Sequence, residues 1–406
     1  MGEAPDRDEM LWLDKADPLR EFRDRFAMGP DPLTYFDGNS LGRPPKATLE
    51  RLRTVLEEEW ADRLIRGWTE GWMDLPTEVG DRLGATVIGA SAGQTVLADS
   101  TSVNLFKVLH AAATLRPDRT EIVIDDANFP TDRYLVSAVA EQRGLTVRWM
   151  TPEPSNGVTA ESLEPLLSSD TAMVVVCHSD YRTAALADLP GITGLVHDAG
   201  ALAVWDLCHS AGVAPVELDA ARADFAVGCT YKYLNAGPGA PAFLYVAARH
   251  LASVRQPIEG WFGAEDVFAM GRTYEPATTM RRMLSGTPNV LGLVAVAEGV
   301  RLIAEAGLDR IRAKGMALTS LVTDLVDTWL APLGAEIASP REAEARGSHV
   351  TVRHPEARVI TDRLIAGGVI PDFRNPDLIR LGLSPLTTSY AEAWDGLRTM
   401  RGIIAA

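Results

Sequence analysis

A lysine flanked by two aromatic residues is the strongest candidate for chemistry in this chain. Lys232 stands between Tyr231 and Tyr233, after the apolar run DFAVGCT (224–230) and before the turn-forming stretch AGPGAP (236–241). Surface lysines more often stand among polar residues, whereas a lysine that follows a buried strand can act as a nucleophile and form a Schiff base with a carbonyl group. We therefore expect Lys232 to carry covalent chemistry.

A carboxylate ends another apolar run, ALAVWDL (201–207), where Asp206 is followed three residues later by His209. A charged side chain at the end of an apolar strand is costly unless it meets a cation or a strong hydrogen-bond donor. The N–H group of a protonated pyridine ring would be such a donor. The alternative interpretation is a buried aspartate that caps the next turn.

Two further strand ends carry groups that could bind an anion and a planar ring. Residues 100–102 (Ser-Thr-Ser) follow TVLAD (95–99) and open a helix, so their hydroxyl and backbone N–H groups could bind a phosphate. After EIVID (121–125), Phe129 could stack on a ring and Asp132 could be a charge at a helix N-terminus. Taken singly, each pattern is also typical of an ordinary capped helix.

The elements that must position these groups alternate along the chain. From about residue 84 onward, short apolar runs such as AMVVVC (172–177) are separated by amphipathic helices. Runs that are apolar throughout are typical of a largely parallel sheet covered by helices on both faces. Ligand sites of such sheets form beyond the carboxyl ends of the strands, so the four groups are expected to meet there. The phosphate-binding segment, the aromatic ring, Asp206 and Lys232 occur in that order, and each is expected to follow a parallel strand. This is the layout of fold-type-I enzymes that use pyridoxal 5′-phosphate (PLP).

The pattern changes towards both ends of the chain. The stretch 46–66 has apolar residues at helical spacing, and beyond residue 291 a long helix precedes a second helix over 308–331. Weaker strands follow around HVTVRH (349–354) and LIRLGLS (378–384). We expect an N-terminal helical segment (1–60) that packs on the small domain, a large PLP-binding domain (61–290) and a smaller α+β C-terminal domain (291–406).

Composition limits the partners of the protein. The 406 residues are 46% hydrophobic and 23% charged, which is typical of a globular protein with two or three lobes. A formal net charge of −16 argues against nucleic acid and anionic membranes as partners. No run approaches the ~20 apolar residues of a membrane span, and the N-terminus is acidic rather than signal-like. The three cysteines lack CxxC spacing and indicate reduced thiols, so we expect a cytoplasmic protein without a metal site.

Sequence strings spread over nearly the whole chain resemble those of one family, the kynureninases. The strings are FDGNSLGRPP (36–45), GWMDLP (71–76), DSTSVNLFK (99–107), NFPTDRY (128–134), WDLCHSAG (205–212), DFAVGCTYKYLNAGPGAPAF (224–243), GWFG (260–263) and LIRLGLSPL (378–386). The segment around Lys232 is highly specific. The resemblance, to the bacterial type within the aminotransferase class V superfamily, implies hydrolytic Cβ–Cγ cleavage of L-kynurenine to anthranilate and L-alanine in tryptophan degradation.

The resemblance also implies roles for single residues. Lys232 would carry PLP as a Schiff base and take the α-proton, Asp206 would hold the ring nitrogen, and Tyr231 would assist proton transfer. The residues implied to bind the cofactor are Thr101, Ser102, Phe129, Pro130, Thr131, Asp132, Cys177, Asp206, His209, Tyr231, Lys232, Trp261 and Thr287. Those implied to bind the substrate are Arg380, which would grip the α-carboxylate, Asn39, Trp72 and Gly286. Trp261 and Thr287 would come from the neighbouring subunit, so a homodimer with shared active sites is implied.

Three departures from the family pattern bear on the substrate, and one of them is Cys177, at a position that often supplies a hydroxyl near the cofactor in family members. Ala264 follows GWFG where family members commonly have His, and Ala184 stands where they commonly have Gly. These leave open a kynureninase-like enzyme for 3-hydroxy- or ring-substituted kynurenine in secondary metabolism. Another fold-type-I PLP enzyme, such as an aminotransferase, and a catalytically inactive scaffold are further alternatives. Retention of Asp206, Lys232 and Arg380 together argues against the scaffold.

Overall fold

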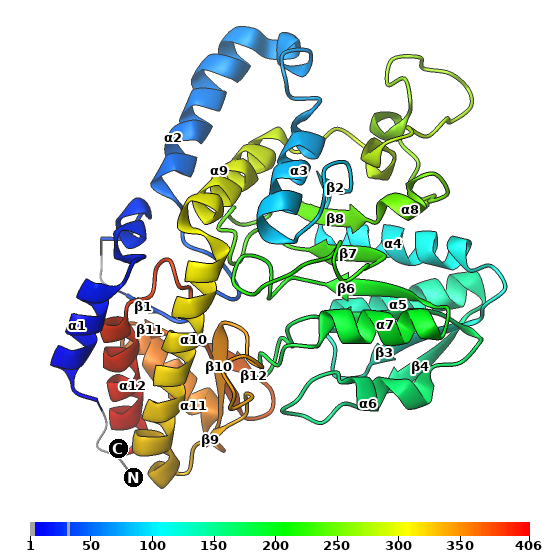
Figure 1. The fold of residues 1–406 in the computed structure, drawn as a ribbon. Helices are drawn as coiled ribbons and strands as arrows, with labels where there is room; N and C mark the ends of the chain where they lie inside the picture. Colours follow the sequence, from blue (N-terminus) through cyan, green and yellow to red (C-terminus); the bar gives the residue numbers. More distant parts are fainter. Residues whose placement is uncertain (1–4, 31–32) are drawn as a thin grey trace.

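The central sheet of the computed structural model, which describes residues 5–30 and 33–406, has the strand order β2-β8-β7-β6-β5-β3-β4 (Figure 1). Its strands are β2 (Thr95–Ala98), β3 (Glu121–Asp125), β4 (Thr146–Met150), β5 (Thr171–Cys177), β6 (Leu202–Asp206), β7 (Phe225–Gly228) and β8 (Ala242–Val246). All pairs from β7 to β4 are parallel, whereas β8 is antiparallel to both β7 and β2. The mainly parallel sheet expected from the sequence is therefore confirmed.

The expectation that each candidate group follows a strand paired in parallel is wrong for β2. The chain reverses through the Gly- and Pro-rich segment after Lys232, and β8 inserts between β7 and β2 as an antiparallel strand. Two antiparallel steps restore the direction, so β2 points the same way as β7. The carboxyl end of β2 thus still lies at the same edge as those of β3, β5, β6 and β7.

Helices cover both faces of the sheet because alternate strand residues point to opposite sides and both sets are apolar. Side chains such as Ile124 and Val204 pack with helices α4 (Thr101–Leu115) and α5 (Pro130–Arg143). Side chains such as Val123 pack on the other face. The helices on that face are α3 (Leu75–Val87), α7 (Leu189–Asp198) and α9 (Val290–Ala306). Two short helices, α6 (Ala160–Leu163) and α8 (Ala248–Leu251), complete this part of the molecule (Figure 1).

A second, antiparallel sheet with the order β12-β13-β10-β9 lies in the C-terminal part. Its strands are β9 (Glu336–Ile337), β10 (His349–Arg353), β12 (Asp372–Arg374) and β13 (Leu378–Gly382), and the helices beside it are α10 (Leu308–Leu325), α11 (Ala357–Ala366) and α12 (Tyr390–Ile404). The N-terminal segment joins this part: helix α1 (Arg7–Ala16) packs beside α12, and β1 (Thr34–Tyr35) pairs with β11 (Val369–Ile370) (Figure 1). The N-terminal segment thus packs on the C-terminal part, and the three-part division of the chain stays a prediction.

Two of the helices expected from the sequence, over residues 46–66 and 308–331, are interrupted. The stretch 46–66 forms α2 (Lys46–Thr54), a π-helix (Val55–Arg63) and a 3₁₀-helix (Leu64–Trp68), with Leu64 in a left-handed conformation at φ 51°. Helix α10 likewise ends in a π-helical and a 3₁₀ turn before residue 334. Residues 1–4 and 31–32 of the expected N-terminal segment lie outside the described residues. Within the described ranges, no helix is both long and apolar enough to cross a membrane.

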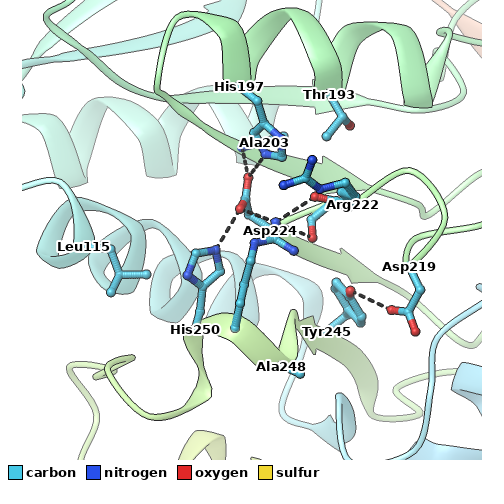
Figure 2. A network of polar contacts seen from close by, with 12 residues as sticks. Leu115, Thr193, His197, Ala203, Asp219, Arg222, Asp224, Tyr245, Ala248 and His250 are labelled. Carbon is cyan, nitrogen blue, oxygen red and sulfur yellow. Dashed lines mark hydrogen bonds and ion pairs between the residues drawn. The ribbon is translucent and has the colours of Figure 1, made fainter.

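The amino-terminal edge of the central sheet is fixed by one buried carboxylate. Figure 2 shows Asp224, just before β7, between His197 at the end of α7 and His250 on α8. The Asp224 oxygens accept hydrogen bonds from His197 Nε2 at 2.8 Å, His250 Nε2 at 2.7 Å and the Ala203 amide at 2.8 Å, and they form an ion pair with Arg249. The network ties α7, β6, β7 and α8 together at the edge opposite the candidate site.

Candidate active site

The carboxyl ends of five strands of the central sheet surround a cavity. Its lining residues are Thr101, Ser102, Phe129, Thr131, Asp132, Cys177, Tyr181, Asp206, Cys208, His209, Tyr231 and Lys232. All of these except Tyr181 and Cys208 are residues that the sequence resemblance assigns to the cofactor. The sheet topology thus gathers groups that lie more than 130 residues apart along the chain.

The end of β2 turns directly into the N-terminus of α4. Asp99 adopts a left-handed conformation at φ 48°, and the Ser100 hydroxyl caps the helix by accepting from the Val103 amide at 3.4 Å. The first N–H groups of a helix have no acceptor within the helix, and the helix dipole gives them a partial positive charge. Thr101 and Ser102 therefore present hydroxyl and amide donors to the cavity, which suits an anion such as a phosphate.

An aromatic wall follows the end of β3. Asn128 fixes the turn, since its amide nitrogen donates to Asp125 Oδ2 at 2.8 Å and its oxygen accepts from the Phe129 amide at 2.7 Å. Pro130 begins α5 and does not line the cavity, so its observed part is to start the helix. The Phe129 ring meets Tyr181 edge to face, with 5.3 Å between the ring centroids. The two rings offer an apolar surface for a planar ligand.

Two carboxyl groups meet inside the cavity. Asp206 is the last residue of β6 and accepts from the Cys208 amide at 2.7 Å, while Asp132 lies in the first turn of α5 and is buried. Burial raises the pKa of Asp132, and the adjacent Asp206 raises it further. Among the described residues, Asp132 Oδ2 has no hydrogen-bond partner. The pair is thus suited to receive a cationic donor.

Lys232 projects into the cavity from the loop after β7. The loop is held by hydrogen bonds from Thr230 Oγ1 to the Pro241 carbonyl at 2.7 Å and from the Asn235 amide to the Lys232 carbonyl at 3.0 Å. Burial alone would lower the pKa of Lys232, but Cys229, Cys208, Tyr231 and Asp206 outweigh it, so the pKa lies above its ordinary value. In the cofactor-free chain the amine is therefore an ammonium group, with the Asp206 carboxyl group nearby.

Tyr231 and His209 complete the polar lining. Burial raises the pKa of Tyr231, so its phenol stays protonated near neutral pH and can donate a proton. Burial and the nearby Lys232 lower the pKa of His209, which keeps its imidazole neutral. In the described part of the chain, His209 Nδ1 has no hydrogen-bond partner. The ring of His349 packs against His209 edge to face, 5.7 Å between centroids.

Two of the expected substrate residues lie close to this lining without forming part of it. Arg380, on β13, is 1% exposed and donates to the Tyr181 carbonyl and to Ser40 Oγ. Asn39 is fully buried, and its amide atoms have no partner within residues 5–30 and 33–406. The loop that carries Asn39 packs on the lysine segment through Gly42, where an added Cβ would meet the Lys232 carbonyl at 2.2 Å.

Four expected residues are not brought to Lys232 within one chain. Trp72 and Thr287 line an apolar groove of about 470 Å³, together with Trp60, Ile65 and other residues. Gly286 lines a neighbouring cavity, and Thr287 lines both this cavity and the groove. Trp261 is 41% exposed and lies beside the loop of residues 264–275 that follows it. For Trp261 and Thr287, the expected origin in the neighbouring subunit stays a prediction. Trp72 and Gly286 were expected near the substrate, and a single chain does not place them there.

The sequence reasoning missed Tyr181 and Cys208 as cavity residues. Cys208 stands between Asp206 and His209, so the position of the segment beyond β6 was a usable signal. Tyr181 follows β5 by four residues, and its place in the wall depends on how the loop after β5 folds back, with the Ala184 and Asp180 backbones hydrogen-bonded at 2.9 Å. No local sequence pattern predicts the conformation of that loop.

Comparisons with known proteins show related sequences over nearly the whole chain. A protein-family model described as "Kynureninase C-terminal domain" matches residues 311–400. The kynureninase of Pseudomonas fluorescens is 43% identical over 405 residues, covering 98% of this chain and 95% of the relative. The kynureninase of Burkholderia pseudomallei (strain 1106a) is 41% identical over 407 residues, with the same coverage of 98% and 95%.

Solved structures share the fold at low sequence identity. An apo cysteine desulfurase from Thermococcus onnurineus NA1 has a TM-score of 0.81 at 20% identity, covering 100% of this chain and 99% of the other. A C-DES lysine-to-alanine variant with glycine covalently linked to its PLP cofactor has a TM-score of 0.80 at 17% identity, covering 98% and 99%. These similarities confirm the expected fold class. The identity to curated relatives over nearly the full length shows, in addition, that the chain belongs to the kynureninase family.

Proposed function

We propose that the cavity around Lys232 binds PLP and that the protein hydrolyses L-kynurenine to anthranilate and L-alanine. The observation that carries the proposal is the gathering of Lys232, Asp206 and the α4 N-terminus in one cavity of a chain of this family. The cavity also fits the group chemically. The helix N-terminus suits the phosphate, and the partnerless Asp132 Oδ2 and His209 Nδ1, among the described residues, suit the polar atoms of the ring.

PLP, when bound, supplies an electron sink for the negative charge that develops on the substrate carbon atoms. Asp206 would hold a proton at the ring nitrogen, because an ionised carboxylate beside that nitrogen favours its charged form. Lys232 would hold the cofactor covalently and, once released, its Nζ would take the proton from the substrate α-carbon. Tyr231, whose phenol carries its proton near neutral pH, would donate that proton near the γ-carbonyl, where water adds.

Arg380 would bind the α-carboxylate of the substrate through its guanidinium group. Asn39, which has two partnerless amide atoms in the described chain, would supply a further polar contact near the same end. Phe129 and Tyr181 would confine the cofactor ring from the solvent side.

We also propose a homodimer in which each subunit completes the other's site. Support comes from the apolar groove beside Trp72, where the side chains of Trp60 and Ile65 are 52% and 77% exposed. Contiguous exposed apolar surface of this kind is typical of protein–protein contacts. Trp261 and Thr287, which do not line the cavity of Lys232 in their own chain, would enter the neighbouring cavity. A cytoplasmic location is supported by the three free cysteines of the described chain.

Incubation of the purified protein and PLP with L-kynurenine tests the proposed activity. Anthranilate and L-alanine should form in equal amounts without an added keto acid, because water is the only co-substrate of the hydrolysis. Dependence on a keto acid, with a transaminated product, would identify an aminotransferase instead. No turnover of any amino acid would leave only a binding function.

A further inference from the structure

Arg380 shares a carboxylate with a second arginine. Strands β12 and β13 are antiparallel with Asp372 opposite Arg380, so their side chains lie on the same face of the sheet. Asp372 Oδ2 pairs with Arg380 Nη2 and also with Arg374 Nη2, the latter at 2.8 Å. The Arg380 side chain is 1% exposed and that of Arg374 is 35% exposed. A deeply buried cation and a half-buried one therefore depend on one oxygen atom.

The cluster has hydrogen-bonding capacity that the protein does not use. Within the described residues, Nε of Arg380 and Nε of Arg374 have no acceptor, and Asp37 Oδ1 has no donor. Burial raises the pKa of Asp37 to about 6, and the nearby Asp372 adds to this, whereas Arg380 and Arg374 oppose it. Unpaired buried donors are costly unless another group satisfies them. An arriving carboxylate would satisfy the Nε and Nη donors of Arg380.

We infer that Asp372 is the internal counter-ion of Arg380, that the substrate α-carboxylate displaces it, and that Arg374 retains Asp372 when this occurs. The inference rests on the proposed function, in which Arg380 binds that carboxylate. Before the substrate arrives, Asp372 neutralises the buried guanidinium and holds its orientation. Asp372 is thus a positioning residue that sets how tightly the site binds an amino acid.

This exchange predicts opposite changes in ligand affinity for substitutions of Asp372 and Arg374. Asp372→Asn removes the competing charge, so a carboxylate ligand should bind Arg380 more tightly. Arg374→Gln removes the second partner of Asp372, so Asp372 should stay on Arg380 and the ligand should bind more weakly. A merely structural role of the cluster would instead weaken ligand binding in both variants.

The test measures ligand dissociation constants of the PLP-loaded protein by calorimetry at low ionic strength. L-Alanine is the probe, and L-alaninamide is the matched ligand without a carboxylate. The Kd of L-alanine should fall about tenfold in Asp372→Asn and rise about tenfold in Arg374→Gln, each corresponding to about 1.4 kcal/mol. The Kd of L-alaninamide should change little in either variant. Arg358→Gln is the control. Arg358, on α11, lies 4.5 Å from the ring centroid of Phe373, which stands between Asp372 and Arg374 on β12.

Kinetics give a second readout. In Asp372→Asn the KM for L-kynurenine should fall while kcat does not rise, because the carboxylate contact is the same in the ground and transition states. Weaker or unchanged L-alanine binding in Asp372→Asn, in a protein whose wild type is active, would overturn the inference. If that variant does not fold, unchanged L-alanine binding in Arg374→Gln would overturn it. A wild type that forms no anthranilate would overturn the proposed function itself.

Discussion

At the scale of single residues, the site depends on buried ionisable groups that the chain itself leaves incompletely satisfied. Asp132 and Asp206 share one region of the cavity with the ammonium group of Lys232. Asp206 raises the pKa of Asp132, and a cation beside Asp132 would stabilise that carboxyl group as an anion. The residues that hold the cofactor are therefore also those whose charge states depend on it.

Substitution of Asp206 tests this dependence. Asp206→Asn should lower kcat for L-kynurenine by roughly 100-fold or more, because a neutral amide does not stabilise a proton on the ring nitrogen. PLP binding, measured by absorbance titration, should persist in weakened form. The control is Asp126→Asn, an exposed aspartate just after β3 that lies outside the cavity lining. A kcat close to that of the wild type in Asp206→Asn would contradict the assigned role.

The aryl end of the substrate gives a second prediction at this scale. In the proposed homodimer, subunit association would bring Trp72 and Thr287 to the substrate ring. In a single chain both line an apolar groove, and the Trp72 indole N–H donates to Glu59 Oε2 at 3.4 Å. A ring hydroxyl that enters such a pocket loses water without full compensation. We therefore expect kcat/KM for L-kynurenine to exceed that for 3-hydroxykynurenine, by less than about 100-fold. A higher kcat/KM for the 3-hydroxy substrate would contradict this expectation.

Lys232 and Asp206 could be predicted because each is unusual where it stands, whereas cavity residues such as Thr131 and Cys177 were expected only from the family resemblance. Asp206 ends an apolar strand and Lys232 follows one, and a charged side chain there costs free energy unless a partner group compensates it. Tyr181 could not be predicted in this way, since its place depends on the fold of the loop after β5. The Asp372–Arg380 pair was missed because the cross-strand register of β12 and β13 is set by tertiary pairing rather than by local pattern.

At the scale of elements, the sheet edge opposite the cavity determines how firmly the strands are held. Asp224 is 1% exposed and joins β6, β7, α7 and α8 (Figure 2). Burial would raise its pKa, but hydrogen bonds from His250, the Ala203 amide and His197 outweigh burial and hold the pKa of Asp224 below its ordinary value. The carboxylate thus contributes stability in its ionised form.

The lowered pKa of Asp224 predicts the pH range over which its carboxylate stabilises the fold. Because the folded-state pKa of Asp224 lies below the unfolded value of about 3.9, its contribution is present above that pH and is lost as the pH falls further. Asp224→Asn should lower the free energy of unfolding at pH 7 by about 3 kcal/mol, since it breaks buried charged pairs. Denaturant unfolding at pH 7 and pH 3 measures both effects.

The variant should lose less stability than the wild type between those two pH values, because it no longer has the Asp224 carboxyl to protonate. Asp395→Asn is the matched control, since Asp395 pairs with Arg7 at the surface. If Asp224→Asn is as stable as this control at pH 7, the network does not stabilise the sheet edge.

The elements themselves could be predicted where periodicity and composition agree. The apolar runs of β3, β5 and β6 predict buried strands correctly. Strand β8 was not predicted, because it follows a Gly- and Pro-rich turn and its pairing with β2 spans more than 140 residues. The break at Leu64 was not predicted either, because a left-handed leucine has no helix-breaking signature in the sequence.

At the scale of the whole molecule, the proposed homodimer explains why a groove of exposed apolar side chains lies apart from the cavity. Ile65 is 77% exposed in that groove. Ile65→Glu should shift the protein towards monomers, as measured by size-exclusion chromatography with light scattering, because a buried unpaired charge opposes association. Ile365→Glu, at an isoleucine of α11 that is 46% exposed, should remain dimeric. Equal behaviour of the two variants would exclude the groove as the interface.

Sharing of the active sites gives a complementation test. Trp261→Ala and Lys232→Ala should each be nearly inactive alone. Mixed after subunit exchange, they should recover about a quarter of wild-type activity, since half of the dimers would be hybrids with one intact site. If exchange is demonstrated and the mixture stays inactive, Trp261 does not act across the interface.

The central claim, that Lys232 carries PLP in this cavity, is tested most directly by reduction of the PLP-loaded protein with borohydride and peptide mapping. The reduction fixes the covalent link, and we predict one labelled peptide, which contains Lys232. Lys107 should stay unlabelled, because its buried ammonium group is paired with Asp99 at 2.6 Å and with the Met283 carbonyl at 2.8 Å. A label on Lys107 or on Lys46, or no bound PLP at all, would contradict the account.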